Sequence, residues 1–132
     1  MEKSEHIQHW LDSAKQDLAV CETLFTNKHY DWCLFIGHLV LEKTLKALWI
    51  RAHFPEPHPR IHNLNKLAAQ IPLDLTESQK TYLNRVNDFY LQGRYPKEKT
   101  EFYKLCTPEF TQQQFGEIKG FYQWLLKKFS AP

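Results

Sequence analysis

The sequence predicts an all-α protein that folds as an up-and-down bundle of four long helices and one short helix. Apolar residues recur at intervals of three and four in several long segments, and no segment alternates apolar and polar residues as a strand would. The chain also has only 4 Gly, which leaves few candidates for hairpin turns. Its 132 residues suffice for one hydrophobic core, so we expect a single domain over residues 1–132.

Composition excludes several classes of protein. The 42% hydrophobic and 14% aromatic content is too high for a disordered chain, and a formal charge of +2 is too small to indicate nucleic-acid binding by itself. No apolar run approaches the ~20 residues of a membrane span, so we expect a cytoplasmic protein without membrane contact. The three cysteines are widely spaced and odd in number, which predicts buried, reduced thiols.

The first helix is expected over residues 4–27, and the second over residues 31–54 with Asp31 as its N-cap. The first segment has one apolar face, formed by Ile7, Leu11, Ala14, Leu18, Cys21 and Phe25. Asp17 lies beside that face and is expected to point toward a neighbouring helix. The connection between the two helices is short, which predicts an antiparallel hairpin.

The second helix is apolar on most of its circumference, which is typical of the helix at the centre of a bundle. Its few polar residues, His38, Glu42 and Lys46, recur every four positions and therefore form one stripe. Because such a helix has no broad solvated face, we expect the stripe to run along a groove or an interface. The proline-rich segment 55–59 ends the helix.

Two helices are expected in the middle of the chain. A short one covers residues 63–71 and carries an apolar face. Thr76 and Gln79 match a capping box, which predicts a helix from there through about Gln92. Gly93 is a suitable residue to end it.

The C-terminal part is expected to contain one mobile segment and one long helix. The charged stretch over residues 94–104 shows no helical period and is expected to be a mobile connection. Thr107 and Pro108 fit the N-cap and first position of the last helix. Its apolar face is formed by Phe115, Ile118, Tyr122, Leu125 and Phe129.

Five short motifs follow one another between residues 10 and 96. They are Trp10-x3-Ala14-x2-Asp17-Leu18, Tyr30-x4-Phe35, the run LEKTLKAL from Leu41 to Leu48, His62-Asn63-Leu64-x2-Leu67, and Tyr90-x3-Arg94-Tyr95-Pro96. In this order and spacing, they resemble the motifs of HEPN domains. The resemblance implies a five-helix bundle that is often dimeric. It also implies a prokaryotic protein encoded beside a minimal nucleotidyltransferase, as one half of a toxin–antitoxin-like pair.

Many proteins of the family that this chain resembles are metal-independent ribonucleases. Their Arg-x4-6-His motif acts on the RNA backbone across a dimer interface. This sequence departs from that pattern, because no histidine follows Arg94. The formal match to the spacing is Arg51 with His58, and prolines at 55 and 57 lie between the two.

The candidate nucleotide- or phosphate-binding residues are His38, Glu42, Lys43 and Lys46 of the second helix, with Arg94 and Tyr95. The basic side chains would donate to phosphate, and Glu42 would orient them or accept a ribose hydroxyl. The aromatic ring beside Arg94 would stack on a base. Simpler interpretations also stay open, with Glu42 and Lys46 as an ion pair and Arg94 as a helix cap.

No metal or cofactor is expected. His58 and His62 have the spacing of a metal-binding pair, but no carboxylate or cysteine lies near them in the sequence. His62 is instead expected to cap or brace the short helix.

The leading hypothesis is a homodimeric HEPN-like protein that binds nucleotide or RNA phosphates and acts with a nucleotidyltransferase. One alternative is a ribonuclease whose centre uses Arg94 or the Arg51/His58 pair. Another is a structural module that only binds another protein.

Overall fold

The computed structural model describes residues 2–130, and the side chains of all of these except residues 96 and 97. This part of the chain contains helices and no strand, which confirms the all-α class. The helices are α1 (Lys3–Thr26), α2 (Tyr30–His53), α3 (Leu64–Ala68), α4 (Glu77–Gln92), α5 (Pro96–Leu105) and α6 (Pro108–Ser130). The four long helices of the prediction are α1, α2, α4 and α6.

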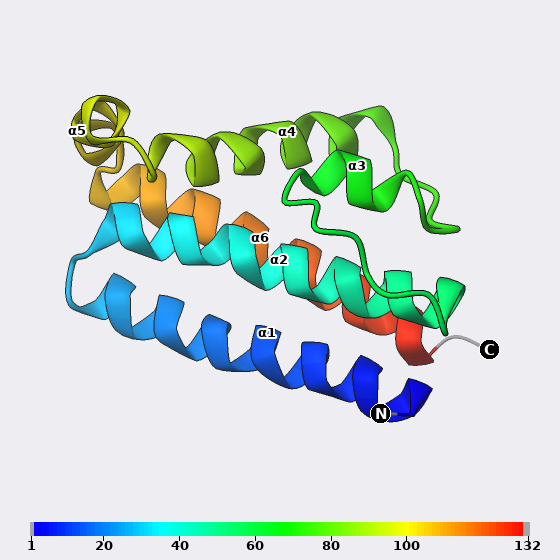
Figure 1. The fold of residues 1–132 in the computed structure, drawn as a ribbon. Coiled ribbons are helices and arrows are strands. Elements are labelled where there is room, and N and C mark those ends of the chain that lie inside the picture. The colour runs from blue at the N-terminus through cyan, green and yellow to red at the C-terminus, as the bar shows by residue number, and fades with distance from the viewer. Residues whose placement is uncertain (1, 131–132) are drawn as a thin grey trace.

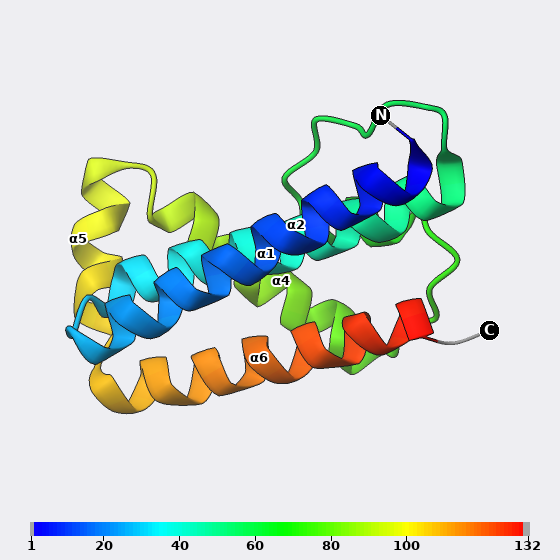
Figure 2. The same ribbon diagram turned by 90° about the horizontal axis from the view of Figure 1, so that it is seen from below.

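Helix α2 is the centre of the bundle, as its apolar sequence predicts (Figure 1). It packs against each of the other described helices. Helix α1 lies antiparallel along one side of α2, and α3 and α4 lie on the opposite side (Figure 1). Seen from below, α6 runs beside α1 and α2, while α5 crosses the end of the bundle near the α1–α2 turn (Figure 2).

The α1–α2 hairpin is confirmed, but α2 begins one residue earlier than expected. His29 occupies the N-cap position without a side-chain cap hydrogen bond, and Asp31 is a buried residue of the first turn. Its carboxylate there benefits from the positive end of the helix dipole, which is the physical reason that an acidic residue suits this position too. The expected N-cap role of Asp31 is therefore wrong.

In the middle of the chain, α3 and α4 both begin at residues whose side chains form N-cap hydrogen bonds. The Oγ1 atom of Thr76 accepts from the backbone of Gln79 at 3.1 Å, and the Gln79 side chain accepts from the backbone of Thr76 at 2.9 Å, so the capping box is confirmed. Helix α3 is shorter than expected. Its N-cap is Asn63, whose side chain accepts from the backbone of Lys66 at 3.0 Å.

The prediction of a mobile connection over residues 94–104 is wrong, because most of this stretch forms α5. The segment starts with a proline at its first helical position, a residue that fits there because its missing N–H needs no partner. Its main anchor is Phe102, which is 1% exposed and stacks on Phe89 with 5.7 Å between ring centroids. Among the α5 side chains that the structure describes, residues 98–105, Phe102 is the one large buried group, so this segment shows no clear periodicity in the sequence.

The remaining general expectations concern thiols and membrane contact. Cys21, Cys33 and Cys106 are all buried and unpaired by disulfides, as predicted. Over the described residues, no helix combines the length and apolar character needed to cross a bilayer.

Replacing Phe102 tests whether α5 is held by its buried ring. Phe102→Ala should lower the free energy of unfolding by about 3–5 kcal/mol, because it removes a buried aromatic side chain and leaves a cavity. Tyr103→Ala is the matched control, since Tyr103 is 66% exposed and its loss should change stability by less than about 0.5 kcal/mol. Urea denaturation followed by circular dichroism measures both; equal losses would contradict the packing of α5.

Candidate functional site

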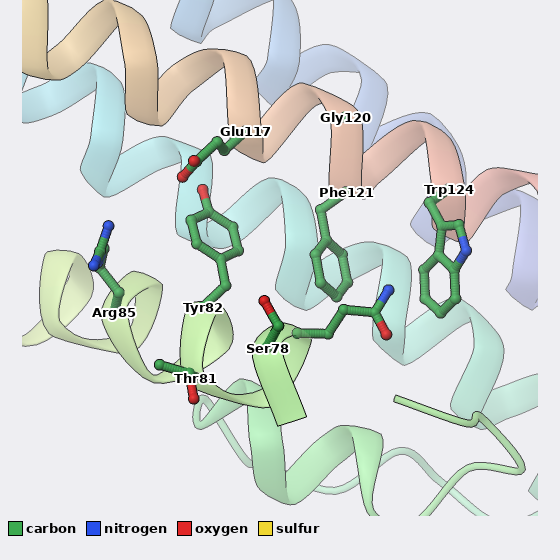
Figure 3. A pocket seen from close by; sticks show the side chains of 9 residues that line it. Ser78, Thr81, Tyr82, Arg85, Glu117, Gly120, Phe121 and Trp124 are labelled. Atoms are coloured by element: carbon green, nitrogen blue, oxygen red, sulfur yellow. The ribbon is translucent and has the colours of Figure 1, made fainter. Parts of the chain in front are cut away.

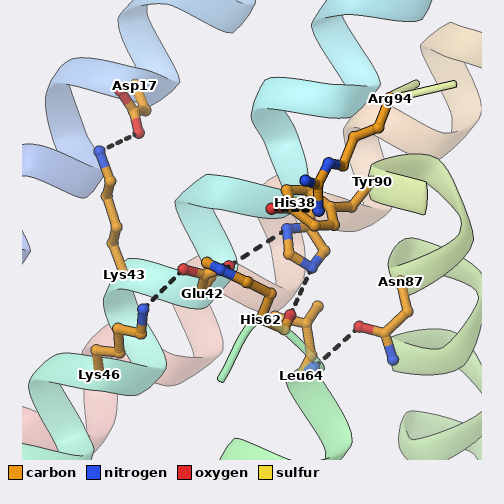
Figure 4. A network of polar contacts seen from close by, with 10 residues as sticks. All are labelled: Asp17, His38, Glu42, Lys43, Lys46, His62, Leu64, Asn87, Tyr90 and Arg94. Carbon is orange, nitrogen blue, oxygen red and sulfur yellow. Dashed lines mark hydrogen bonds and ion pairs between the residues drawn. The ribbon is translucent and has the colours of Figure 1, made fainter. Parts of the chain in front are cut away.

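The polar stripe of α2 is buried. His38, Glu42 and Lys46 are 0%, 4% and 4% exposed, and they follow one another along the side of α2 that faces the loop before α3 (Figure 4). Burying a charged group is unfavourable unless it is paired with an opposite charge or a hydrogen-bonding group. The contacts within the stripe therefore determine whether its burial destabilises the fold.

Glu42 accepts at both carboxylate oxygens. Nζ of Lys46 donates to Oε2 at 2.9 Å, which confirms the ion pair expected from the i,i+4 spacing. Nδ1 of His62 donates to Oε1 at 3.0 Å, from a loop 20 residues further along the chain. Lys46 also lies over the ring of Trp10, with Nζ 5.4 Å from the centroid. The carboxylate is therefore compensated on both sides.

His62 joins the stripe, although the sequence does not place it among the candidate binding residues. The expectation that it caps α3 is wrong, because Asn63 fills that position. The side chain of His62 turns back to Glu42 instead, and its backbone carbonyl accepts a hydrogen bond from Nε2 of His38 at 2.9 Å. The motif that begins at His62 indicates from the sequence that this residue is important. No helical spacing relates it to Glu42, which lies 20 residues earlier.

His38 is a neutral, buried imidazole. Burial lowers its pKa from 6.5 to about 4, an effect larger than the attraction of the Glu42 carboxylate, which acts in the opposite direction. Because Nε2 donates to a carbonyl oxygen, the neutral ring carries its lone pair on Nδ1. This explains why Nδ1 stays 3.7 Å from the nearest oxygen of Glu42, since both atoms are acceptors.

Tyr90 of α4 is a platform on which several groups stack. Its ring centroid lies 4.5 Å from that of His38, 5.3 Å from that of His62 and 5.4 Å from that of Phe35. The guanidinium carbon of Arg94 lies 5.1 Å from the same centroid, and Nη1 donates to the Tyr90 hydroxyl at 3.3 Å. Tyr90 thereby brings two predicted residues, His38 and Arg94, to one place.

A cavity of about 190 Å³ opens at this platform. It is lined by His38, His62, Asn63, Asn87, Tyr90, Leu91 and Arg94. Arg94 is exposed, and no carboxylate in the described part of the chain pairs with it. Tyr95 is 53% exposed but does not line the cavity.

Lys43 lies on a different side of α2. Its ammonium group donates to Asp17 at 2.7 Å and to Ser13 at 2.8 Å, so it belongs to the contact between α1 and α2 (Figure 4). The expectation that Asp17 points to a neighbouring helix is confirmed. Glu42 and Lys43 are adjacent in sequence, and successive helical residues point about 100° apart, so Glu42 turns toward His62 while Lys43 turns toward α1.

Arg51 and His58 contact different elements. Arg51 donates to the carbonyl of Lys128 at 2.7 Å, near the end of α6, whereas the ring of His58 packs edge-on against Trp10 at 4.8 Å. The two side chains are not brought together as a catalytic pair. In the described part of the chain, no group of three or more His, Cys, Asp or Glu residues gathers as metal ligands do.

A larger, open groove of about 620 Å³ lies between α4 and α6 (Figure 3). It is lined by Ser78, Gln79, Thr81, Tyr82, Arg85, Glu117, Gly120, Phe121 and Trp124. None of the predicted binding residues lies there, so the smaller cavity at Tyr90 is the candidate functional site.

Comparison with known proteins agrees with this fold. The family profile of the HEPN domain matches residues 7–129. The crystal structure of TT1696 from Thermus thermophilus is similar in fold, with a TM-score of 0.78 and 18% sequence identity, over 92% of this chain and 97% of that one. No curated protein sequence matches the chain.

Substitution of His38 tests the buried neutral imidazole. The unfolded chain binds a proton at this residue below about pH 6.5, whereas the folded chain binds it only near pH 4, so its contribution to stability is present above pH 6.5 and lost as the pH falls toward 4. This loss should reach up to about 3 kcal/mol. His38→Gln keeps a donor for the His62 carbonyl and should show a shallower decline in urea denaturation between pH 7 and pH 4; parallel declines would contradict the assignment.

Proposed function

Because this chain belongs to the HEPN domain family, whose members are typically dimeric and RNA-related, we propose that it binds a nucleotide or RNA phosphate through Arg94. The binding site is the cavity at Tyr90, and the observation that carries the proposal is the guanidinium at its rim, which no carboxylate among the described residues pairs with. Arginine suits this task because its planar group donates two parallel hydrogen bonds to phosphate oxygens.

The surroundings of Arg94 support phosphate binding. The guanidinium of Arg94 lies over the Tyr90 ring, and its Nη1 donates to the Tyr90 hydroxyl. Its other donors are available to an anion. No ion pair among the described residues competes for it. Tyr95 follows directly and is exposed, so its ring is available to stack on a base.

The other predicted residues have different parts in this proposal. His38 and Glu42 are buried and position the wall of the cavity, with Lys46 holding Glu42 from its far side. Lys43 is occupied by Asp17 on the other side of α2. Among the basic candidates, Arg94 is therefore the residue that contacts phosphate.

We further propose that the chain forms a homodimer and associates with a minimal nucleotidyltransferase, as a toxin–antitoxin-like pair. The support is the family membership together with exposed large apolar side chains near the α4 and α5 ends. These residues are Trp32, Leu91, Tyr95, Tyr103 and Leu105. Size-exclusion chromatography with light scattering measures the oligomeric state, and co-purification with a co-expressed nucleotidyltransferase measures the association.

Arg94→Ala should abolish ligand-dependent stabilisation in a thermal-shift titration with ATP, GTP or a short single-stranded RNA. Arg85→Ala is the matched control, because Arg85 is an exposed arginine that lines the α4–α6 groove instead. Its thermal shift should equal that of the wild type.

The pattern across these variants decides the site. If the wild type responds and Arg94→Ala responds equally, phosphate is not bound at Tyr90. If Arg85→Ala alone loses the response, the ligand occupies the α4–α6 groove and the proposed site is wrong.

A further inference from the structure

The groove between α4 and α6 has an aromatic lining that the fold holds in place (Figure 3). The Tyr82 hydroxyl donates to the backbone carbonyl of Gln114 at 3.2 Å, and the Tyr82 ring stacks on Phe121 with 6.2 Å between the ring centroids. Phe121 in turn contacts Trp124 edge to face at 5.6 Å. The volume of the groove, about 620 Å³, lies in the range of small-molecule sites, about 300–1,000 Å³. The lining therefore offers a preformed apolar surface to a small ligand.

Two opposite charges lie at one end of this groove. Arg85 extends from α4 and Glu117 from α6, both beside Tyr82 (Figure 3). Burial raises the pKa of the Tyr82 hydroxyl, Glu117 raises it further and Arg85 lowers it, so both charges act at the same place. In the described part of the chain, neither side chain forms an ion pair with the other or with a third group. Both charges are therefore available to one ligand.

A glycine keeps the groove open between its charged end and Trp124. Gly120 of α6 lines the groove, and a Cβ atom added there would meet no atom within 4 Å outside the adjoining helix backbone. Gly116, one helical turn earlier, has the same open space but does not line the groove. Glycine is unfavourable in the interior of a helix, so Gly120 weakens α6 while it leaves room above the helix for a ligand.

We propose that this groove binds a free α-amino acid with a large apolar side chain. The carboxylate of such a ligand accepts from Arg85, and its ammonium group donates to Glu117. Its side chain packs on Phe121 and Trp124. An α-amino acid carries both charges on one carbon beside its apolar group, which matches two opposite charges at the end of an aromatic surface. An apolar carboxylic acid or amine engages one of the two charges, and a residue within a peptide chain has neither.

The charges and the aromatic rings have different parts in this recognition. Ion pairs at an exposed position contribute little in water, so Arg85 and Glu117 select the head group while apolar contact supplies most of the affinity. The groove shares no described lining residue with the cavity at Tyr90. A nucleotide held by Arg94 and an amino acid held in the groove therefore occupy different places, and failure of either proposal leaves the other standing.

A titration with matched ligands tests the recognised chemistry. L-phenylalanine should shift the backbone amide signals of the groove residues in the heteronuclear NMR spectrum of the wild-type protein. Phenethylamine lacks the carboxylate and hydrocinnamate lacks the ammonium group, so each should bind roughly tenfold more weakly. Glycine lacks the apolar side chain and should bind more weakly still. Equal affinities for phenylalanine and the two singly charged analogues would overturn the proposal, as would the absence of shifts with phenylalanine, leucine and tryptophan alike.

Variants of α6 test the place of binding. Gly120→Leu puts a side chain into the groove and should abolish the shifts with phenylalanine, whereas Gly116→Leu is the matched control and should bind like the wild type. Both replace a helical glycine with a good helix former, so neither should lower the thermal midpoint. Glu117→Gln should reduce the affinity for phenylalanine to that for hydrocinnamate, whose own affinity should not change. Binding that persists in Gly120→Leu, or that is lost equally in Gly116→Leu, would place the ligand elsewhere and overturn the proposal.

Discussion

The carboxylate of Glu42 lies 4% exposed in the middle of the central helix, where water cannot solvate it. It is tolerated because Lys46 donates to one oxygen and His62 to the other. Leaving a buried charge without its partner typically costs about 3–5 kcal/mol, so the requirement is strong compared with a domain's net stability of about 5–15 kcal/mol. Lys46 lies four residues away on the same helix, whereas His62 lies in the loop that follows α2.

The loop that carries His62 is therefore fixed against α2, and the arrangement of the following elements depends on it. Its backbone carbonyl accepts from His38, and the next turn is attached to α4 by a hydrogen bond from the backbone of Leu64 to Asn87 at 2.9 Å. These bonds bring α4 close enough for Tyr90 to stack on both imidazoles. The position of Arg94 follows, because its guanidinium rests on the Tyr90 ring.

The features that could be predicted from the sequence are those that depend on the spacing of residues within one helix. The bundle, the central place of α2 and the Glu42–Lys46 pair all follow from periods of three and four residues. The partnership of Glu42 with His62 could not be predicted, because 20 residues and a proline-rich loop separate the two. The motif from Leu41 to Leu48 places Lys43 with the stripe in the sequence. The rotation of the helix from Glu42 to Lys43 turns its side chain toward α1 instead. Helix α5 could not be predicted from periodicity, since its main anchor is a single residue, Phe102.

The charge balance along α2 also determines what the cavity offers to a ligand. Glu42 accepts from Lys46 and His62, so His62 must carry a hydrogen on Nδ1 and turn its Nε2 edge away from the carboxylate. His38 is neutral because of its burial, and it adds no second cation that would compete for the carboxylate. The stripe of His38, Glu42 and Lys46 is therefore buried, and it affects the cavity by orienting other side chains. Its buried charges orient a half-exposed histidine, while a separate arginine supplies the positive charge at the rim.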